Sequence, residues 1–202
     1  MSVLQDNIAE HALGSVTVVD QSFTVGANVQ RYLLALLTCN ADPTPSSITY
    51  GGVAMGAVAT GLVKVKVYGL VAPATGANTF NCQWAAARDA HVVLLSLYNV
   101  DQVAPTGTII TVDDGGGTTW TTTPTVKPYG RAYEIGIVAS DAVATGAQTV
   151  LYDHVQFAGW HVMSWVPSTQ AITWTMVAGG EHKVYTIPIN PIKPPAGAVW
   201  FW

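Results

Sequence analysis

The sequence predicts an all-β protein, built as a single antiparallel β-sandwich of about a dozen short strands. Apolar and polar residues alternate with a period of two along most of the chain, as at 63–68, where three valines alternate with two lysines and a tyrosine. Glycine and proline, which favour turns, bound most of these runs. No run has the spacing of a long amphipathic helix, and the best helical candidate is only 6–13.

Each alternating run is taken as one strand, and the turn residues around it set its limits. Strands are expected at 16–19, 30–38, 47–50, 53–59, 63–68, 79–85, 91–98, 108–112, 132–140, 148–152, 156–166, 172–177 and 183–189. The glycines at 51–52 and 115–117 and the Pro-x-x-Gly at 73–76 are typical turn signals. Two lysines share one face of 63–68, and we expect them to point outward.

The domain organisation follows from where these signals stop. Residues 1–190 are predicted to form one β-sandwich domain, within which the Thr- and Pro-rich segment 118–128 is a long loop. Residues 191–202 form a Pro-rich, extended tail that ends in aromatic residues. Because three neighbouring aromatic side chains are costly to solvate, we expect Trp200, Phe201 and Trp202 to dock on their own domain or on a neighbour, and they are the candidate anchors for a partner surface.

Composition narrows the possible partners. Hydrophobic residues make up 50% of the 202 residues and charged residues only 10%, which favours association between protein surfaces. The 8 Lys and Arg residues are scattered and the net charge is -4, so nucleic acid is not an expected partner. No apolar run approaches the ~20 residues that cross a bilayer, and the first residues lack the layout of a secretory signal. The two cysteines are expected to be buried thiols.

The sequence lacks the usual signatures of a reaction centre. Its five histidines lie far apart, so neither a metal nor another cofactor is expected, and Asp113-Asp114 before three glycines is better explained as a turn than as a calcium loop. There is no Gly-x-Ser-x-Gly, and Glu134 has no acidic neighbour at glycosidase spacing. We therefore predict that the protein is not an enzyme; a hydrolase would need a pocket that gathers Asp153, His154 and Glu134.

The tryptophans offer one candidate ligand platform. Trp84, Trp160, Trp165 and Trp174 lie in phase with apolar neighbours and are expected in the core. Trp120 stands among threonines, where with Tyr129 it would form a platform for a sugar or a subunit; a ring folded back onto its own domain is the structural alternative.

Three segments resemble a jelly-roll domain found in phage virion proteins and some bacterial surface proteins. They are the strand, Gly-Gly turn and strand at 48–55, the strand, Pro-x-x-Gly turn and Thr-rich strand at 65–79, and the Gly-Val-Asp-Gln-like corner at 96–105. Asn99 replaces the glycine of that corner, and asparagine also tolerates positive φ. Asp101 in the corner is expected to accept backbone hydrogen bonds and fix the turn. The resemblance implies a jelly-roll fold and a structural or adhesive role.

Two functions remain open at this point. The first is a non-enzymatic virion structural protein, in particular a capsid decoration or cement protein on the exterior of the particle. Its partners would be its own copies, with a trimer fitting threefold positions, and a major capsid or other virion protein. The second is a carbohydrate-binding or host-adhesion module of a tail fibre or secreted protein, with surface glycans as its partner.

Overall fold

The computed structural model describes all residues except 40, 43, 157–158 and 194–202, and it describes no side chains at 154–161. The prediction of an all-β antiparallel sandwich is confirmed. The described residues form no helix that is long and apolar enough to cross a membrane. The strands are β1 (Leu4–Val25), β2 (Tyr32–Cys39), β3 (Ser47–Tyr50), β4 (Val53–Ala54), β5 (Gly56–Ala59), β6 (Val65–Val71), β7 (Gly76–Tyr98), β8 (Ile110–Asp114), β9 (Thr119–Thr122), β10 (Arg131–Val138), β11 (Ala142–Ala144), β12 (Thr149–Gln156), β13 (Gly159–Val166), β14 (Ile172–Met176) and β15 (His182–Ile189).

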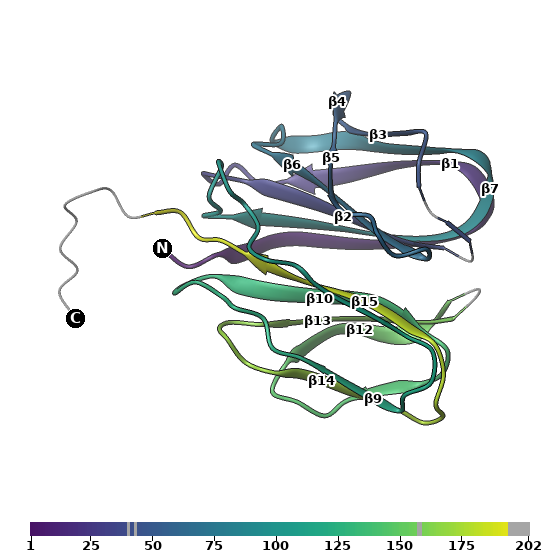
Figure 1. Ribbon diagram of the computed structural model, residues 1–202. Coiled ribbons are helices and arrows are strands. Elements are labelled where there is room, and N and C mark those ends of the chain that lie inside the picture. Colours follow the sequence, from purple (N-terminus) through teal and green to yellow (C-terminus); the bar gives the residue numbers. More distant parts are fainter. Residues whose placement is uncertain (40, 43, 157–158, 194–202) are drawn as a thin grey trace.

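The largest sheet is organised around the long strand β7. Strand β1 pairs with β7 from Leu4↔Tyr98 to Val25↔Gly76, while the other edge of β7 takes β2 and then β3. The pairing of β1 with β7 shifts register around residues 13–18, and such bulges increase the local bend of a strand. Both strands curve there, so the sheet folds over on itself (Figure 1).

Two further sheets complete the molecule. One has the order β12-β13-β10-β15-β8, and the smaller one has the order β11-β14-β9. With the two arms of the first sheet, they give four stacked layers of strands (Figure 1). Strands β2 and β15 are buried along their whole length because they lie in inner layers, covered on both faces.

Three hydrophobic cores fill the spaces between the four layers. We call them the upper, middle and lower core, from the top of Figure 1 downward. The upper core lies between the two arms of the first sheet and includes Leu33, Leu37, Phe80 and Leu94. The middle core includes Leu34, Leu36, Ile135 and Tyr185, and the lower core includes Trp120, Ala132, Trp174 and Val184. The middle core therefore joins residues before and after position 100 into one body.

The hairpin of β3 and β4 shows how local sequence sets the structure. Tyr50 pairs with Val53, so Gly51 and Gly52 form a two-residue loop. Their φ values are +56° and +78°, and a turn with two positive φ values is the one that suits the twist of a hairpin. The glycine pair predicted as a turn at 51–52 is found there.

Several predicted boundaries were wrong. The runs 79–85 and 91–98 belong to one strand, β7, because β1 pairs alongside the intervening residues. Segment 118–128 is not wholly loop, since it contains β9, and the helical candidate 6–13 lies in β1.

The expectation that both lysines of 63–68 point outward was also wrong. Lys66 is 5% exposed, and its Nζ donates to the carbonyl oxygens of Thr60 and Leu62, at 2.7 Å each. Asp42 lies 3.2 Å from the same ammonium group. Three oxygen partners replace the water that the buried charge has lost.

Candidate functional site

A pocket of about 450 Å³ lies at the end of the molecule where the first residues meet the segment that follows β15 (Figure 1). Its lining surface is largely apolar, and we call it the terminal pocket. It is lined by Met1, Ser2, Lys127, Pro128, Tyr129, Pro191, Ile192 and Lys193. Concave apolar sites of this size are typical of binding sites.

Asn99 holds the walls of this pocket together. Its Nδ2 donates to Ser2 O at 3.0 Å, and its carbonyl accepts from Ile192 N, also at 3.0 Å. Its φ is +59°, a left-handed value that asparagine tolerates better than most residues. One corner residue thus positions chain segments nearly 100 residues away on either side.

Tyr129 is the aromatic side chain of the pocket, and it is 49% exposed. Its φ is +69°, which is strained for a bulky residue, and strain of this kind clusters at functional sites. The next residue, Gly130, packs so tightly that an added Cβ would lie 2.7 Å from Ile189 O. Close packing of Gly130 on β15 holds the backbone of this turn in place.

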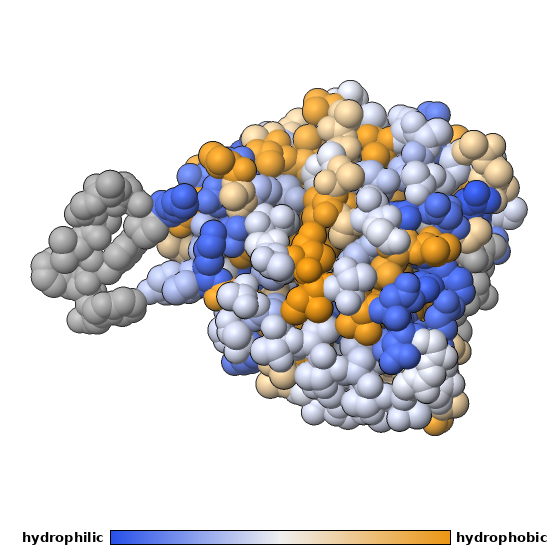
Figure 2. Space-filling view, in the orientation of Figure 1, coloured by the Kyte–Doolittle hydropathy of each residue, from blue (hydrophilic) through white to orange (hydrophobic). Residues whose placement is uncertain are grey.

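A second, shallower hollow of about 310 Å³ adjoins the terminal pocket and shares Ile192 and Lys193 with it. Val103, in its lining, is 95% exposed, and Val29, beside Gln30, is 63% exposed. On the face drawn in Figure 2, hydrophobic residues form a narrow stripe and smaller groups among hydrophilic ones, so that face is not continuously apolar. Adjoining exposed apolar residues at one end of a molecule are typical of an interaction surface.

The corner residue Asp101 lies beside this hollow. Its Oδ1 accepts from Val103 N at 2.9 Å and from Ala104 N at 3.2 Å. These two backbone hydrogen bonds lower the pKa of Asp101, and nearby Lys193 and Lys127 act in the same direction. The carboxylate therefore fixes the turn that carries Val103.

The other predicted site residues fall in different places. Trp200, Phe201 and Trp202 lie outside the described residues. Trp120 is 4% exposed in β9, where it stacks on Trp174 and His182, so its ring has no free face for a sugar. The structure therefore does not bring Trp120 and Tyr129 into one exposed platform. Exposed and buried residues alternate along β9, with Trp120 and Thr122 on the buried face, and the threonine-rich sequence conceals this alternation.

Glu134 is fully buried and joins two sheets. Its carboxylate accepts from Trp120 Nε1 at 3.1 Å, Thr122 Oγ1 at 2.5 Å and Thr186 Oγ1 at 2.8 Å. Burial raises the pKa of Glu134, and the three hydrogen bonds oppose that rise. Enclosed in the lower core, this carboxyl group lines neither of the two hollows at the terminal end. His154 of the hydrolase alternative has no described side chain.

A polar cluster that sequence reasoning missed surrounds His91. His91 Nε2 lies 2.6 Å from Glu10 Oε1, and its Nδ1 lies 3.4 Å from Thr38 Oγ1. The order hydroxyl, imidazole, carboxylate is that of a catalytic triad. Thr38 has no exposed surface, however, so its hydroxyl does not meet an external substrate in this conformation. The three residues lie on three different strands, β1, β2 and β7, so no local sequence motif predicts the cluster.

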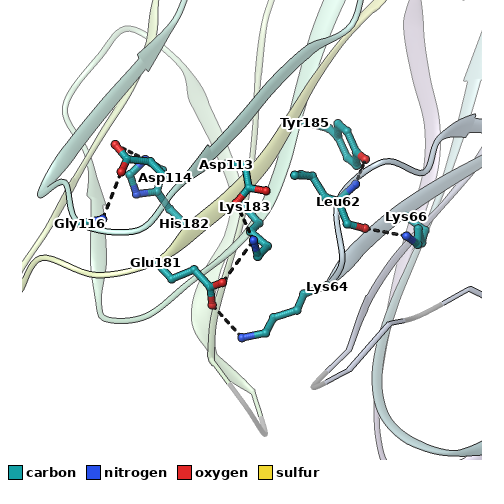
Figure 3. A network of polar contacts seen from close by, with 10 residues as sticks. All are labelled: Leu62, Lys64, Lys66, Asp113, Asp114, Gly116, Glu181, His182, Lys183 and Tyr185. Atoms are coloured by element: carbon teal, nitrogen blue, oxygen red, sulfur yellow. Dashed lines mark hydrogen bonds and ion pairs between the residues drawn. The ribbon is translucent and has the colours of Figure 1, made fainter.

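A third polar group links the sequence-distant halves of the molecule, and it is drawn in Figure 3. Lys64, before β6, lies 2.8 Å from Glu181, before β15, and Lys183 lies 2.5 Å from Asp113 and 3.2 Å from Glu181. The hydrogen bond from Lys64 lowers the pKa of Glu181, and the bond to Asp113 raises that of Lys183. Nearby, Leu62 N donates to Tyr185 Oη at 2.5 Å. The Lys64–Glu181 and Leu62–Tyr185 contacts fasten the upper layers to the lower ones, whereas Lys183 and Asp113 lie on neighbouring strands of one sheet.

No cluster of three or more His, Cys, Asp or Glu suitable for a metal occurs in the part of the chain that the structure describes. Cys39 and Cys82 are buried free thiols, as predicted. Comparison with known proteins finds no matching family model, no similar curated protein and no similar solved structure. The terminal pocket is thus the best-defined candidate site, and its interpretation depends on its own residues.

Proposed function

We propose that this protein is a non-enzymatic structural component of a virion, namely a capsid decoration or cement protein on the exterior of the particle. It acts by binding copies of itself and a major capsid or other virion protein. The observation that carries the proposal is the apolar terminal pocket with its strained, half-exposed Tyr129. The likeness of 48–55, 65–79 and 96–105 to jelly-roll virion domains supports the same class.

The way the chain uses its polar residues fits this function. Glu134 and the Lys64–Glu181 pair of Figure 3 hold layers together, and Lys66 is bound by carbonyl oxygens of the segment just before its own strand. Surface contacts then depend on apolar area, at roughly 25 cal/mol for each Å² removed from water. Repetition over many copies adds avidity without any single strong contact.

The tail supplies the predicted anchor. Residues Trp200, Phe201 and Trp202 follow the pocket residue Lys193 within nine positions. Tryptophan is enriched among the residues that dominate interface energies. We assign these three residues to contacts with a neighbouring subunit or virion protein.

Cutting the chain after Pro195 tests this assignment. Sedimentation equilibrium is expected to show that the full chain forms an oligomer and that the shortened chain associates more weakly, with a lower average mass. The control is Val177→Ser, which removes a 74% exposed apolar side chain outside the terminal pocket and leaves the mass unchanged. An unchanged mass and unchanged particle binding after the cut would remove the tail from the proposal.

Two further observations address the class of function itself. Purified particles from the source of this sequence should contain the protein in many copies; its absence from them would contradict the proposal. A glycan array addresses the carbohydrate-binding alternative. Saturable binding by the full chain that is lost in Tyr129→Ala would favour that alternative instead.

A further inference from the structure

Strand β1 has one edge to which no other strand is paired among the described residues, although it is 22 residues long. Proteins usually block such edges with lysine, proline or bulges, since an open edge is a template for another strand. Register shifts interrupt β1 between residues 5 and 7 and between 13 and 18. The stretch 18–25 has an unbroken register with β7 and contains neither lysine nor proline.

The hydrogen bonds of β7 show which groups of 18–25 face outward. Gln83 O accepts from Ser46 N at 2.8 Å and Thr79 O accepts from Gly51 N at 2.9 Å, both on the β3 side of β7. In an antiparallel ladder the N–H and C=O of one residue point to the same side. The partners of Gln83 and Thr79 on β1, Val18 and Ser22, therefore direct their backbone groups away from β7.

Asp20 and Thr24 follow the same alternation, so their backbone groups also point away from β7. A hydrogen bond of Thr24 confirms this direction independently. The Thr24 carbonyl accepts from Asn7 Nδ2 at 2.9 Å, which places it on the outer side of the strand. The side chains at 18, 20, 22 and 24 are exposed, whereas Val19, Phe23 and Val25 are buried in the upper core. An added strand would thus extend a sheet whose inner face is already packed.

We propose that 18–25 pairs with the same stretch of a second copy, antiparallel, about a two-fold axis at Gln21. This register sets Val18 opposite Thr24, whose carbonyl oxygen can accept a second hydrogen bond beside the one from Asn7, whereas an N–H has only one proton to donate. It also sets Asp20 opposite Ser22, whose hydroxyl can donate to the carboxylate. An axis at Asp20 would set two carboxylates opposite one another, which is destabilising. An axis at Ser22 would set Val18 opposite Gly26, whose N–H already donates to Asp6 Oδ2 at 2.7 Å.

The sequence of 18–25 favours a second copy of the same stretch as its partner. In the register centred on Gln21, no two like charges face each other across the two strands. The inference rests on the proposed function only in taking self-association as the protein's mode of action. Its test involves no residue of 194–202, so the edge contact and the tail contact can fail separately.

Disulfide trapping in the full chain tests the register. Gln21→Cys would face its own copy in a non-hydrogen-bonded pair, with Cα atoms about 4.5 Å apart, within disulfide range. Mild oxidation is expected to give a reducible covalent dimer. The native thiols are poor competitors, since both are buried and burial raises the pKa of Cys39 to about 12.

Ser22→Cys is the matched control, because it is more exposed than position 21 but faces Asp20 of the other copy. Its two sulfur-bearing residues would be diagonal neighbours, about 7–8 Å apart. Cross-linking at 21 but not at 22 supports the proposal. Equal or stronger cross-linking at 22, or none at either position, overturns it.

A second variant keeps the proposal testable if Gln21→Cys does not fold. Ser22→Glu sets a second carboxylate opposite Asp20 of the other copy and is expected to weaken self-association about tenfold or more, while Ser22→Thr leaves it unchanged. Sedimentation equilibrium measures both. An unaltered dimerisation constant in a folded Ser22→Glu protein would contradict the edge contact.

Discussion

The upper and lower cores are both closed between two layers of strands, yet they are filled differently. The upper core holds apolar side chains, the thiols of Cys39 and Cys82 and the hydroxyl of Tyr50, which donates to Phe23 O at 3.0 Å, packed between two arms of one bent sheet. The lower core lies between two separate sheets and holds Glu134, with the hydroxyls of Thr122 and Thr186. Among the described residues of these two cores, the buried carboxyl group lies in the one that joins two separate sheets.

This difference shows two ways of fixing the position of one layer on another. In the upper core, β1 and β7 continue from one arm to the next, so covalent continuity sets the register. In the lower core, β9 belongs to a small three-stranded sheet, and its Trp120 and Thr122 donate to Glu134 of β10. A buried hydrogen-bonded carboxyl group costs desolvation energy but specifies one arrangement.

The largest effect is expected from the apolar core. Phe80→Ala should lower the free energy of unfolding by about 3–5 kcal/mol, because it leaves a cavity where no exposed surface existed. Val53→Ala, at a residue that is 54% exposed, should change it by less than about 0.5 kcal/mol. Urea unfolding measures both. Similar small losses in the two variants would show that the upper core is not tightly packed.

The lower core should show a pH dependence that the upper core lacks. Below the ordinary pKa of 4.5, Glu134 holds its proton in the folded and the unfolded chain alike. Above pH 4.5, Glu134 ionises in the unfolded chain while it still holds its proton in the folded chain, because burial raises its pKa there. The free energy of unfolding therefore falls as the pH rises through the folded pKa. The loss is at most about 1.4 kcal/mol per pH unit within that window.

Glu134→Gln removes the titration while its amide can still accept from Trp120 and meet the two threonine hydroxyls. The stability difference between this variant and the wild type should therefore shift in favour of the variant as pH rises from 4.5 to 8. Urea unfolding across this range measures the shift. A difference that stays constant with pH would mean that Glu134 does not titrate abnormally.

A smaller effect is expected at the corner that builds the terminal pocket. Asn99→Gly keeps the positive φ and loses only the bond to Ser2, whereas Asn99→Ala also places a Cβ in the left-handed region. The alanine variant should be less stable than the glycine variant by about 1–2 kcal/mol. Thermal unfolding compares the two. Equal stability of the two variants would show that the left-handed φ at position 99 imposes no strain on an alanine.

The smallest effect concerns the ion pairs between the halves. The side chains of Lys64 and Glu181 are 30% and 43% exposed, so Lys64→Met should cost no more than about 1 kcal/mol, and less at high salt. Lys127→Met, on the pocket rim, is the control. A loss that does not decrease with salt would indicate packing rather than charge.

Sequence reasoning succeeded where the signal was local. The Gly51-Gly52 turn and the strand 47–50 are set by neighbouring residues, and the alternation in most strands needs no distant partner. Sequence reasoning failed where contacts with other segments of the chain determine the structure. Lys66 is buried because Thr60, Leu62 and Asp42 supply oxygen atoms, and β7 is continuous because β1 lies along it.

The candidate site was less predictable than the fold. The terminal pocket joins Ser2, Tyr129 and Ile192, which only the folding of the whole chain brings together. Asn99 was singled out for its tolerance of positive φ, but its bonds to Ser2 and Ile192 have no counterpart in the linear pattern. Likewise, the threonines around Trp120 left both a ligand platform and a ring folded back onto its own domain open, and the contacts with Glu134 and Trp174 show the folded-back ring.

The mass of the full chain in solution tests the central claim most directly, namely that this protein acts by binding its own copies. Sedimentation equilibrium over a range of concentrations should show a defined oligomer that weakens in Ser22→Glu and in the chain cut after Pro195. A single species of 21.3 kDa at every concentration would contradict the claim.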